Sequence, residues 1–170
     1  MGMKLEDVEA IARALDRTGA RFIVVGGLAV VLHGYSRTTY DLDLVIQLEP
    51  RNIVAAFEAL KALGYRPLVP ITAEQFANEA LRKSWIDEKG MQVLNFNSDR
   101  HRGTGVDVFV TEPFDFDDEY NNAYLQEFMP GITLRVARID TLVAMKRVAG
   151  RAKDLADIEE LLSIKKALDE

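Results

Sequence analysis

Three aspartates have the residue type and spacing of a site that binds a divalent cation. Asp41 and Asp43 lie two residues apart at the start of an apolar run, and Asp107 interrupts a second apolar run, 106–110. Side chains two apart in a strand point to the same face, so Asp41 and Asp43 repel each other unless a cation lies between them. Carboxylate oxygens are the ligands that Mg²⁺ takes, often alongside substrate phosphates.

Each aspartate also has a purely structural explanation. Asp41 and Asp43 could form a solvated strand end, and Asp107 could be capped by a backbone N–H or a buried arginine. If the two strands are neighbours, however, the three carboxylates converge. They could then hold two Mg²⁺ ions roughly 3.5–4 Å apart, the spacing used for in-line phosphoryl chemistry.

A glycine pair precedes the first two aspartates. Gly26 and Gly27 follow the apolar run 22–25 and open the short apolar stretch 28–32. Bare backbone N–H groups at such a strand-to-helix turn can cradle a phosphate, which glycine lets approach without a Cβ in the way. The alternative is a plain turn, which glycine also serves.

Basic residues in the last third could face such phosphates. Lys146 and Lys153 could neutralise a leaving pyrophosphate, with Asp157 orienting one of them. Lys153 and Asp157 are four residues apart and share a helix face. A solvated face with intrahelical ion pairs is the alternative, and it is the one that the sequence alone favours for Asp157.

Three further positions carry weaker signals. Arg37 could contact phosphate or acceptor, or simply pair with Asp41 or Asp43. The basic loop 100–102 could touch RNA or a nucleotide, although most such loops are solvated. His33 is expected to be a helix-end residue with a satisfied ring rather than a metal ligand.

Composition narrows the function classes. The 170 residues are 48% hydrophobic and 28% charged, with two histidines and no cysteine, which excludes a disulfide scaffold, a thiolate metal site and a cysteine nucleophile. No apolar run approaches the roughly 20 residues of a membrane span, and the charged stretch 1–13 is unlike a signal peptide, so we expect a soluble cytoplasmic protein.

The net charge of −6 is concentrated in one segment, because residues 111–134 contain six acidic and no basic residues. A strongly basic nucleic-acid-binding domain is therefore not supported, while a local basic groove stays open.

The elements that must position these residues alternate along the chain. Periodicity predicts helices at 5–15, 28–32, 50–63, 73–89, 139–148 and 152–168, and strands at 22–25, 41–47, 91–96, 106–111 and 132–136. The expected apolar faces of the last two helices are Leu142, Met145 and Val148, and Leu155, Ile158 and Leu162. The acidic stretch 114–119 is expected to be exposed.

This order predicts an α+β fold, an α/β two-layer arrangement with a mixed sheet, flanking helices and a C-terminal helical segment. We expect one domain over 1–170, with its core at about 20–112 and C-terminal helices at about 139–168.

Taken together, residues from about 20 to 162 resemble the nucleotidyltransferase superfamily, which has the DNA polymerase β-like fold. The resemblance lies in Gly26-Gly27 after a strand, Asp41-Leu42-Asp43 opening the next strand, and the distant Asp107. The AbiEii-type toxin branch is suggested by His33-Gly34, by Arg37-Thr38-Thr39 and by the late stretch from Lys146 to Ile158.

The resemblance implies transfer of a nucleoside monophosphate from an NTP such as ATP to a hydroxyl, with release of pyrophosphate (EC 2.7.7 type). It implies Mg²⁺ or Mn²⁺ as cofactor, held by the residues that also do the chemistry, Asp41, Asp43 and Asp107. It further implies a set of nucleotide-binding residues: Gly26, Gly27, Arg37, Thr38, Lys146 and Lys153.

The acceptor and partners stay open. The acceptor could be a tRNA end, a protein hydroxyl or a small molecule, and a toxin would have a cognate antitoxin; no membrane partner is expected. One alternative is a catalytically inactive member of the same fold that binds a nucleotide or a protein. Another is an unrelated α+β scaffold, in which the three carboxylates would be scattered.

Overall fold

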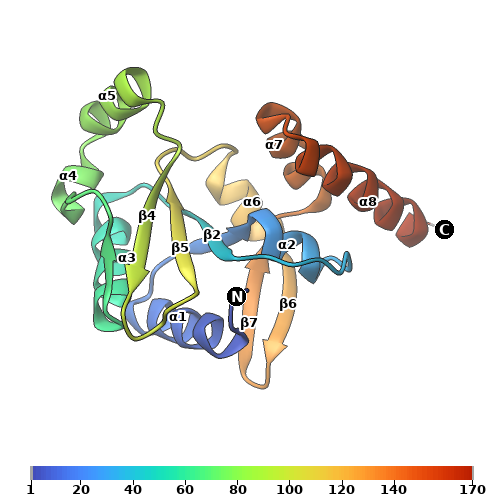
Figure 1. The fold of residues 1–170 in the computed structure, drawn as a ribbon, viewed down its shortest axis with the longest axis horizontal. Helices are drawn as coiled ribbons and strands as arrows, with labels where there is room; N and C mark the ends of the chain where they lie inside the picture. The colour runs from blue at the N-terminus through green and yellow to red at the C-terminus, as the bar shows by residue number, and fades with distance from the viewer. Residues whose placement is uncertain (1, 170) are drawn as a thin grey trace.

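A mixed seven-stranded sheet forms the centre of the computed structural model, which describes residues 2–169 (Figure 1). The strands, in the spatial order β3-β4-β5-β2-β1-β7-β6, are β1 (Phe22–Val25), β2 (Asp41–Ile46), β3 (Tyr65–Pro67), β4 (Val93–Ser98), β5 (Gly105–Phe109), β6 (Tyr124–Met129) and β7 (Ile132–Val136). The helices are α1 (Leu5–Thr18), α2 (Gly26–Leu32), α3 (Pro50–Ala62), α4 (Ala73–Ala77), α5 (Glu79–Lys89), α6 (Phe116–Asn122), α7 (Ile139–Ala149) and α8 (Ala152–Asp169).

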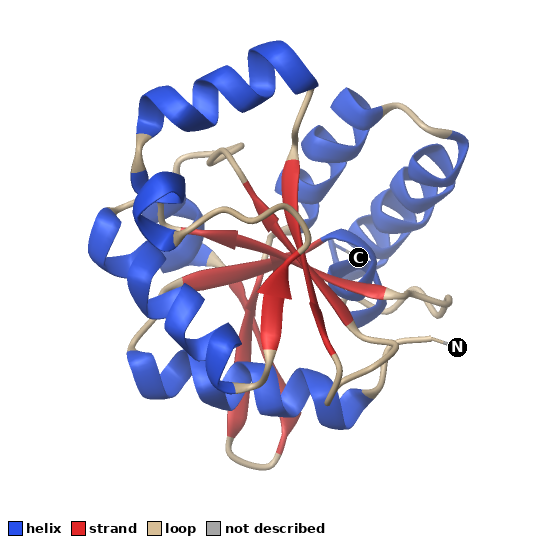
Figure 2. Cartoon of the chain, turned by 60° about the vertical axis from the view of Figure 1, so that its left-hand side comes forward, coloured by secondary structure: helices blue, strands red, loops and turns tan. Residues whose placement is uncertain are grey.

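The helices flank the sheet on both sides, as expected for an α+β fold. Figure 2 shows the strands fanned by the twist that L-residues impose on a sheet. In Figure 1, α3 and α4 lie beside the β3–β4 end of the sheet, whereas α7 and α8 form a hairpin at the other side, near α2. Within residues 2–169, no helix is long and apolar enough to span a membrane.

Three neighbouring strands, β4, β5 and β2, alternate between a buried and an open face. The buried face consists of apolar side chains that belong to the core: Leu42, Leu44, Leu94, Phe96, Val106 and Val108. The opposite face contains Val45, Val93 and Phe109 together with five polar side chains that are half-buried or exposed: Asp41, Asp43, Asn95, Asn97 and Asp107. One face of the sheet therefore stabilises the fold, and the other is available for chemistry.

Two predicted boundaries are corrected. The single helix expected at 73–89 is two helices, because Asn78 adopts an extended conformation and its side chain accepts a hydrogen bond from the first turn of α5. The short edge strands β3 and β6 were not predicted, since neither has enough alternation to distinguish it from a loop.

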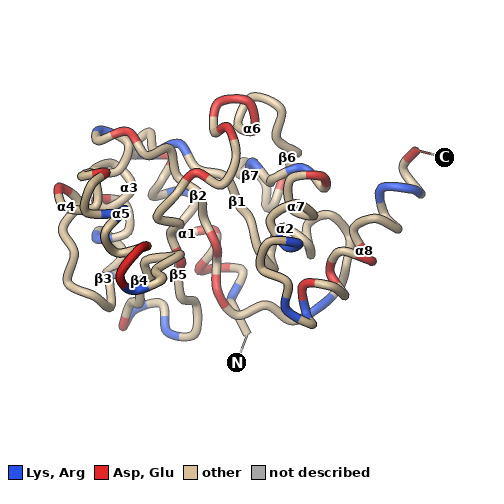
Figure 3. Tube along the Cα trace, turned by 90° about the horizontal axis from the view of Figure 1, so that it is seen from above, with Lys and Arg blue, Asp and Glu red and all other residues tan. Residues whose placement is uncertain are grey.

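The acidic stretch is also more structured than predicted. Phe116 opens α6 and is buried, and Glu119 is only 1% exposed. The Glu119 carboxylate accepts hydrogen bonds from the backbone and guanidinium of Arg138 and from the hydroxyl of Thr141. Part of the negative charge that gathers at α6 (Figure 3) is thus compensated within the fold.

The expected apolar faces of the last two helices are wrong in part. Val148, Leu155 and Leu162 are 90%, 58% and 40% exposed. On α8 the buried side contains Ile158 and Leu161 but also two acidic residues, Asp154 and Asp157. Those carboxylates pair with cations, and this pairing turns the two leucines outward.

Candidate active site

The sheet register brings together the aspartates of two distant segments. β2 and β5 are parallel neighbours, and Asp43 lies directly opposite Asp107, with Asp41 opposite Gly105. Neighbouring strands are about 4.8 Å apart, and residues at matched positions face the same side. The condition that these two strands are neighbours is therefore met, and Asp43 and Asp107 lie side by side on one face.

The pair Asp43 and Asp107 is electrostatically strained. Burial raises the pKa of Asp43 to about 7, helped by the adjacent Asp107 carboxylate, which hydrogen-bonds to it, and by Asp41; Lys146 opposes the rise. Burial also raises the pKa of Asp107, and Asp41 adds to this, whereas hydrogen bonds from Asn95 and Asp43 work against it. Two partly buried carboxylates in contact favour a shared proton or a cation between them.

The donor set suits a hard cation, but it is not closed around one point. Within residues 2–169, no three acidic or histidine side chains converge closely enough to enclose an ion. The contact between Asp43 and Asp107, with Asp41 on the same face, still supplies oxygen ligands whose mutual repulsion a divalent cation would relieve. The residues thus fit Mg²⁺ or Mn²⁺, provided that the Asp41 side chain moves toward the pair.

The glycine pair packs directly against this face. Gly26 has φ of +70°, and a Cβ there would overlap the Asp43 carboxylate, with its Cγ only 2.7 Å away. At Gly27 a Cβ would lie 2.6 Å from Thr39 Oγ1 and 3.0 Å from Arg37 Nη2. Glycine is therefore required by the protein's own packing at both positions, because the side chains of Asp43, Thr39 and Arg37 occupy the space that a Cβ would take.

Thr38 does not face the glycine turn, whereas its neighbour Thr39 does. Thr38 is exposed, and its carbonyl oxygen accepts a hydrogen bond of 2.9 Å from Arg37 Nη1. Thr39 is the threonine whose hydroxyl faces Gly27. Sequence reasoning could have found Thr39 from the period of two, because Thr39, Asp41 and Asp43 are successive odd positions.

A charged cluster lies next to the carboxylates, built around three buried charged residues of α7 and α8, and connects the α2–β2 loop to these two helices. We define it as Arg37, Lys146, Arg151, Asp154 and Asp157. Arg37 Nη2 and Lys146 Nζ lie 3.0 and 2.9 Å from Asp157 Oδ2, and Arg151 Nε lies 2.8 Å from Asp154 Oδ2. Lys146 also lies 3.7 Å from Asp154.

Three charged side chains of the cluster are buried, so their ion pairs fix how α7, α8 and the α2–β2 loop pack together. The side chains of Asp154 and Asp157 are each 2% exposed and that of Lys146 is 9% exposed. Burial raises the pKa of Asp154, but hydrogen bonds from Arg151 outweigh it and hold the pKa below its ordinary value. Each of the two carboxylates thus lies against two cations, which compensate its charge in the interior.

The charged cluster decides one open alternative and corrects one prediction. Arg37 pairs with neither Asp41 nor Asp43 but with Asp157, 120 residues away along the chain. Asp157 is not on a solvated face, and Lys153 does not share its environment. Lys153 is exposed and takes part in no ion pair within residues 2–169.

His33 lies at the C-terminal end of α2, as predicted. His33 Nε2 lies 2.8 Å from the carbonyl oxygen of Ala137, and its ring stacks on Tyr124, so its ring is satisfied as expected.

Asn95 is a residue of the site that the sequence did not indicate. Its side-chain amide donates a hydrogen bond to Asp107, and only the pairing of β4 with β5 could have indicated this contact.

Comparisons with known proteins agree with this geometry. Residues 3–169 match the family described as "Nucleotidyltransferase of unknown function (DUF6036)". No curated protein sequence matches the chain significantly.

Similar folds occur among solved structures. One is the lincosamide antibiotic adenylyltransferase LnuA with lincomycin bound, which is 12% identical with a TM-score of 0.60, over 96% of this chain and 99% of that one. Another is an antigenic nucleotidyltransferase-like protein from Paracoccidioides brasiliensis, 18% identical with a TM-score of 0.50, over 96% of this chain and 78% of that one. At these identities the likeness concerns the fold. The family match over nearly the whole chain is decisive, and the protein belongs to the DUF6036 family of nucleotidyltransferases.

Proposed function

We propose that this protein is a metal-dependent nucleotidyltransferase that moves a nucleoside monophosphate from an NTP to a hydroxyl acceptor. The observation that carries the proposal is the direct register of Asp43 with Asp107, with Asp41 on the same face and Gly26 packed against Asp43. Like charges held together beside a glycine turn and a lysine have no structural benefit of their own. They suit a cation and a triphosphate.

In the proposed reaction the acceptor oxygen bonds to the α-phosphorus, the bond to the bridging oxygen breaks, and pyrophosphate leaves. Divalent ions held by Asp41, Asp43 and Asp107 would neutralise phosphate charge and lower the pKa of the acceptor hydroxyl. Asp107 takes up the hydroxyl proton. Such transfers depend mainly on positioning and on charge neutralisation, which carboxylates and cations of the chain provide.

The nucleotide would lie on the β1 side of the carboxylates. Gly26 is half-buried and Gly27 is buried beneath Thr39 and Arg37, so a triphosphate at this turn would lie beside Gly26 and contact the Arg37 side chain. Arg37 lies over Gly27 with its Nε buried and unpartnered among the described residues, and Lys146 lies near enough to influence Asp43. These cations would balance the leaving pyrophosphate.

The acceptor would approach from the other side of the carboxylates. In-line displacement places the attacking hydroxyl and the leaving group on opposite sides of the phosphorus. On the β4 side, a shallow cavity of about 460 Å³ is lined by Arg66, Asn97 and Arg102, among others, and adjoins the carboxylate face without including it. That volume suits a small molecule, as does the similarity in fold and length to a lincosamide adenylyltransferase.

The remaining expectations stay predictions. These are a tRNA or protein acceptor, membership of the AbiEii-type toxin branch, a cognate antitoxin and the choice of ATP as donor. Lys153, as an exposed residue, is the least supported member of the predicted nucleotide site.

A label-transfer assay tests the proposal. Each α-³²P NTP is incubated with protein and Mg²⁺ and with three acceptor pools: tRNA, lysate protein and a small-molecule extract. We expect one NTP to label one pool with the wild type and with the control Asp87→Asn, which changes an exposed aspartate of α5. We expect Asp43→Asn to lower the rate at least about 10³-fold, because metal-assisted charge stabilisation contributes several kcal/mol.

Two results would contradict the proposal. One is transfer by Asp43→Asn at the wild-type rate. The other is an absence of label in every pool together with no Mg²⁺-dependent NTP binding. Absence of label alone would also result from a missing acceptor, but an active transferase must bind its NTP.

A further inference from the structure

Asn95 lies on β4 directly opposite Asp107 of the neighbouring strand β5. β4 and β5 are antiparallel, and Asn95 is the register partner of Asp107. The Nδ2 group of Asn95 donates a hydrogen bond of 2.5 Å to Oδ1 of Asp107. A three-residue row therefore crosses the sheet from Asn95 through Asp107 to Asp43.

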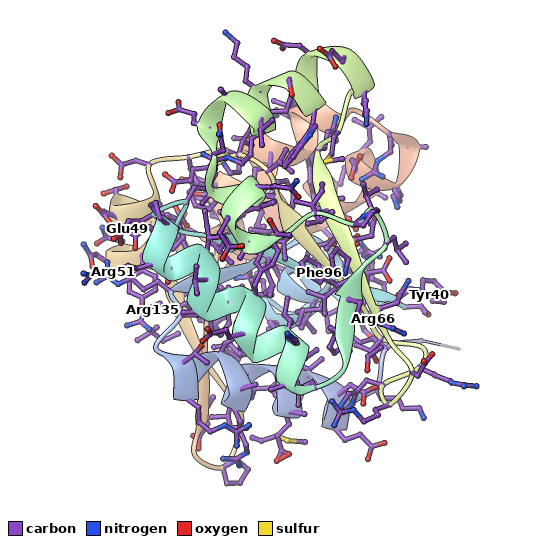
Figure 4. The ribbon with its side chains drawn as sticks, turned by 90° about the vertical axis from the view of Figure 1, so that its left-hand side faces the viewer. Tyr40, Glu49, Arg51, Arg66, Phe96 and Arg135 are labelled. Carbon is purple, nitrogen blue, oxygen red and sulfur yellow. The ribbon has the colours of Figure 1, made fainter. Side chains whose placement is uncertain are left out.

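The side chain of Asn95 lies on the open face. Asn95 is exposed, whereas its neighbours Leu94 and Phe96 are each 1% exposed on the core side. Phe96 packs against Phe57 of α3 on the core side. In Figure 4, Arg66 of β3 lies on the side of the sheet away from that helix. Core packing thus does not dictate the residue type at 95, and asparagine is depleted in strands.

The hydrogen bond constrains the Asp107 carboxylate. One oxygen is occupied by a neutral donor, so rotation of the carboxylate away from Asp43 would break a short hydrogen bond. Partners of this kind orient metal ligands, and their loss typically lowers metal affinity or activity 10–100-fold. A neutral donor suits the position, since a cation there would compete with the bound metal.

We infer that Asn95 is a positioning residue for Asp107, holding its carboxylate beside Asp43 in the orientation that ligates the divalent cation. This inference rests on the proposed function. Asn97 provides a matched comparison: it lies two residues further on the same face and is also exposed, but its side chain makes no hydrogen bond within residues 2–169.

The test compares Asn95→Leu with Asn97→Leu. Both changes remove an exposed amide of similar size from the same strand face. The dissociation constant for Mn²⁺ is measured from the electron paramagnetic resonance signal of free Mn²⁺, and thermal unfolding is followed in EDTA. We expect Asn95→Leu to raise the Mn²⁺ dissociation constant about 10–100-fold with an unchanged unfolding temperature, and Asn97→Leu to leave that constant within about twofold of the wild-type value. Because Asn97 lines the proposed acceptor cavity, the two variants are compared by Mn²⁺ affinity and not by transfer activity.

The outcomes separate this inference from the proposed function. If the wild type binds Mn²⁺, Asp43→Asn does not, and Asn95→Leu binds like the wild type, the positioning role is wrong while the metal site stands. If Asn97→Leu weakens binding as much as Asn95→Leu, the effect is not specific to Asp107 and the inference is also wrong. If the wild type binds no Mn²⁺, both the metal site and the positioning role fail.

Discussion

The carboxylate face of β2 and β5 and the charged cluster of α7 and α8 handle acidic residues in opposite ways. On the carboxylate face, Asp43 and Asp107 contact each other, and their pKa values rise. In the charged cluster, Asp154 and Asp157 are more deeply buried, yet each lies against two cations. Unbalanced charge at an open face indicates where a ligand binds, and balanced charge in the interior indicates what holds the site in place.

The two regions also differ in which parts of the chain they bring together. The carboxylate face is built by neighbouring strands, whereas the charged cluster connects the loop before β2 with the last helix. Asp157 holds both Arg37, which lies over Gly27, and Lys146, which influences Asp43. The charged cluster therefore positions cations that the proposed nucleotide site needs.

The largest expected change in stability comes from breaking the charged cluster. Asp157→Asn leaves Lys146 and Arg37 without their shared anion, and breaking a buried ion pair costs about 3–5 kcal/mol. Urea unfolding should show a fall of that size in the free energy of unfolding.

The matched control is Asp140→Asn, which removes an exposed partner of Lys165 on the same pair of helices. It should change stability little. Equal stability of both variants would mean that the charged cluster is not the constraint described here.

A smaller effect is expected at the carboxylate face from Gly26→Ala. Alanine there meets a positive φ, which costs about 1–3 kcal/mol, and also overlaps Asp43. Gly19 has a φ of +72° with no neighbouring atom within 4 Å of where an alanine Cβ would lie, so Gly19→Ala has the first cost alone. We expect a fall in unfolding temperature of roughly 2–4 °C per kcal/mol for both variants, and a loss of label transfer only for Gly26→Ala.

The last expected effect, also at the carboxylate face, is a slope of stability with pH. The pKa of Asp43 rises from the ordinary 3.8 to about 7 on folding, so the folded protein holds this proton more tightly than the unfolded chain. In EDTA the free energy of unfolding should therefore fall as the pH rises from about 4 to about 7, and then level off.

Asp43→Asn should lack this component of the slope, so the stability of the variant relative to the wild type should increase between those pH values. Mg²⁺ competes with the proton and should stabilise the wild type more at pH 8 than at pH 5. Parallel pH profiles for the two proteins would show that the carboxylate pair is not strained.

Much of the carboxylate face could be predicted from the sequence because it follows from local rules. A period of two places Asp41 and Asp43 on one face, and an aspartate within the apolar run 106–110 indicates a site rather than core. The glycine pair, Gly26 and Gly27, indicated the strand-to-helix turn that lies beside these aspartates. The missing contact, Asn95 with Asp107, depends on strand register, which no local pattern contains.

The charged cluster could not be predicted for the same reason. Its ion pairs join residues as far apart as Arg37 and Asp157, and their burial reverses the usual rule that charged residues lie outside. Hydrophobic periodicity therefore assigned Leu155 and Leu162 to the core, and the structure exposes both.

The central claim is that the carboxylate face is a metal-dependent nucleotidyl-transfer site. The most direct test is a crystal structure with Mn²⁺ and a non-hydrolysable ATP analogue, with Mn²⁺ located by its anomalous scattering. We predict Mn²⁺ within about 2.0–2.3 Å of oxygens of Asp43 and Asp107, with Asp41 drawn in and the triphosphate at Gly26–Gly27. Mn²⁺ and nucleotide bound elsewhere, with Asp43 and Asp107 still in contact with each other, would contradict the claim.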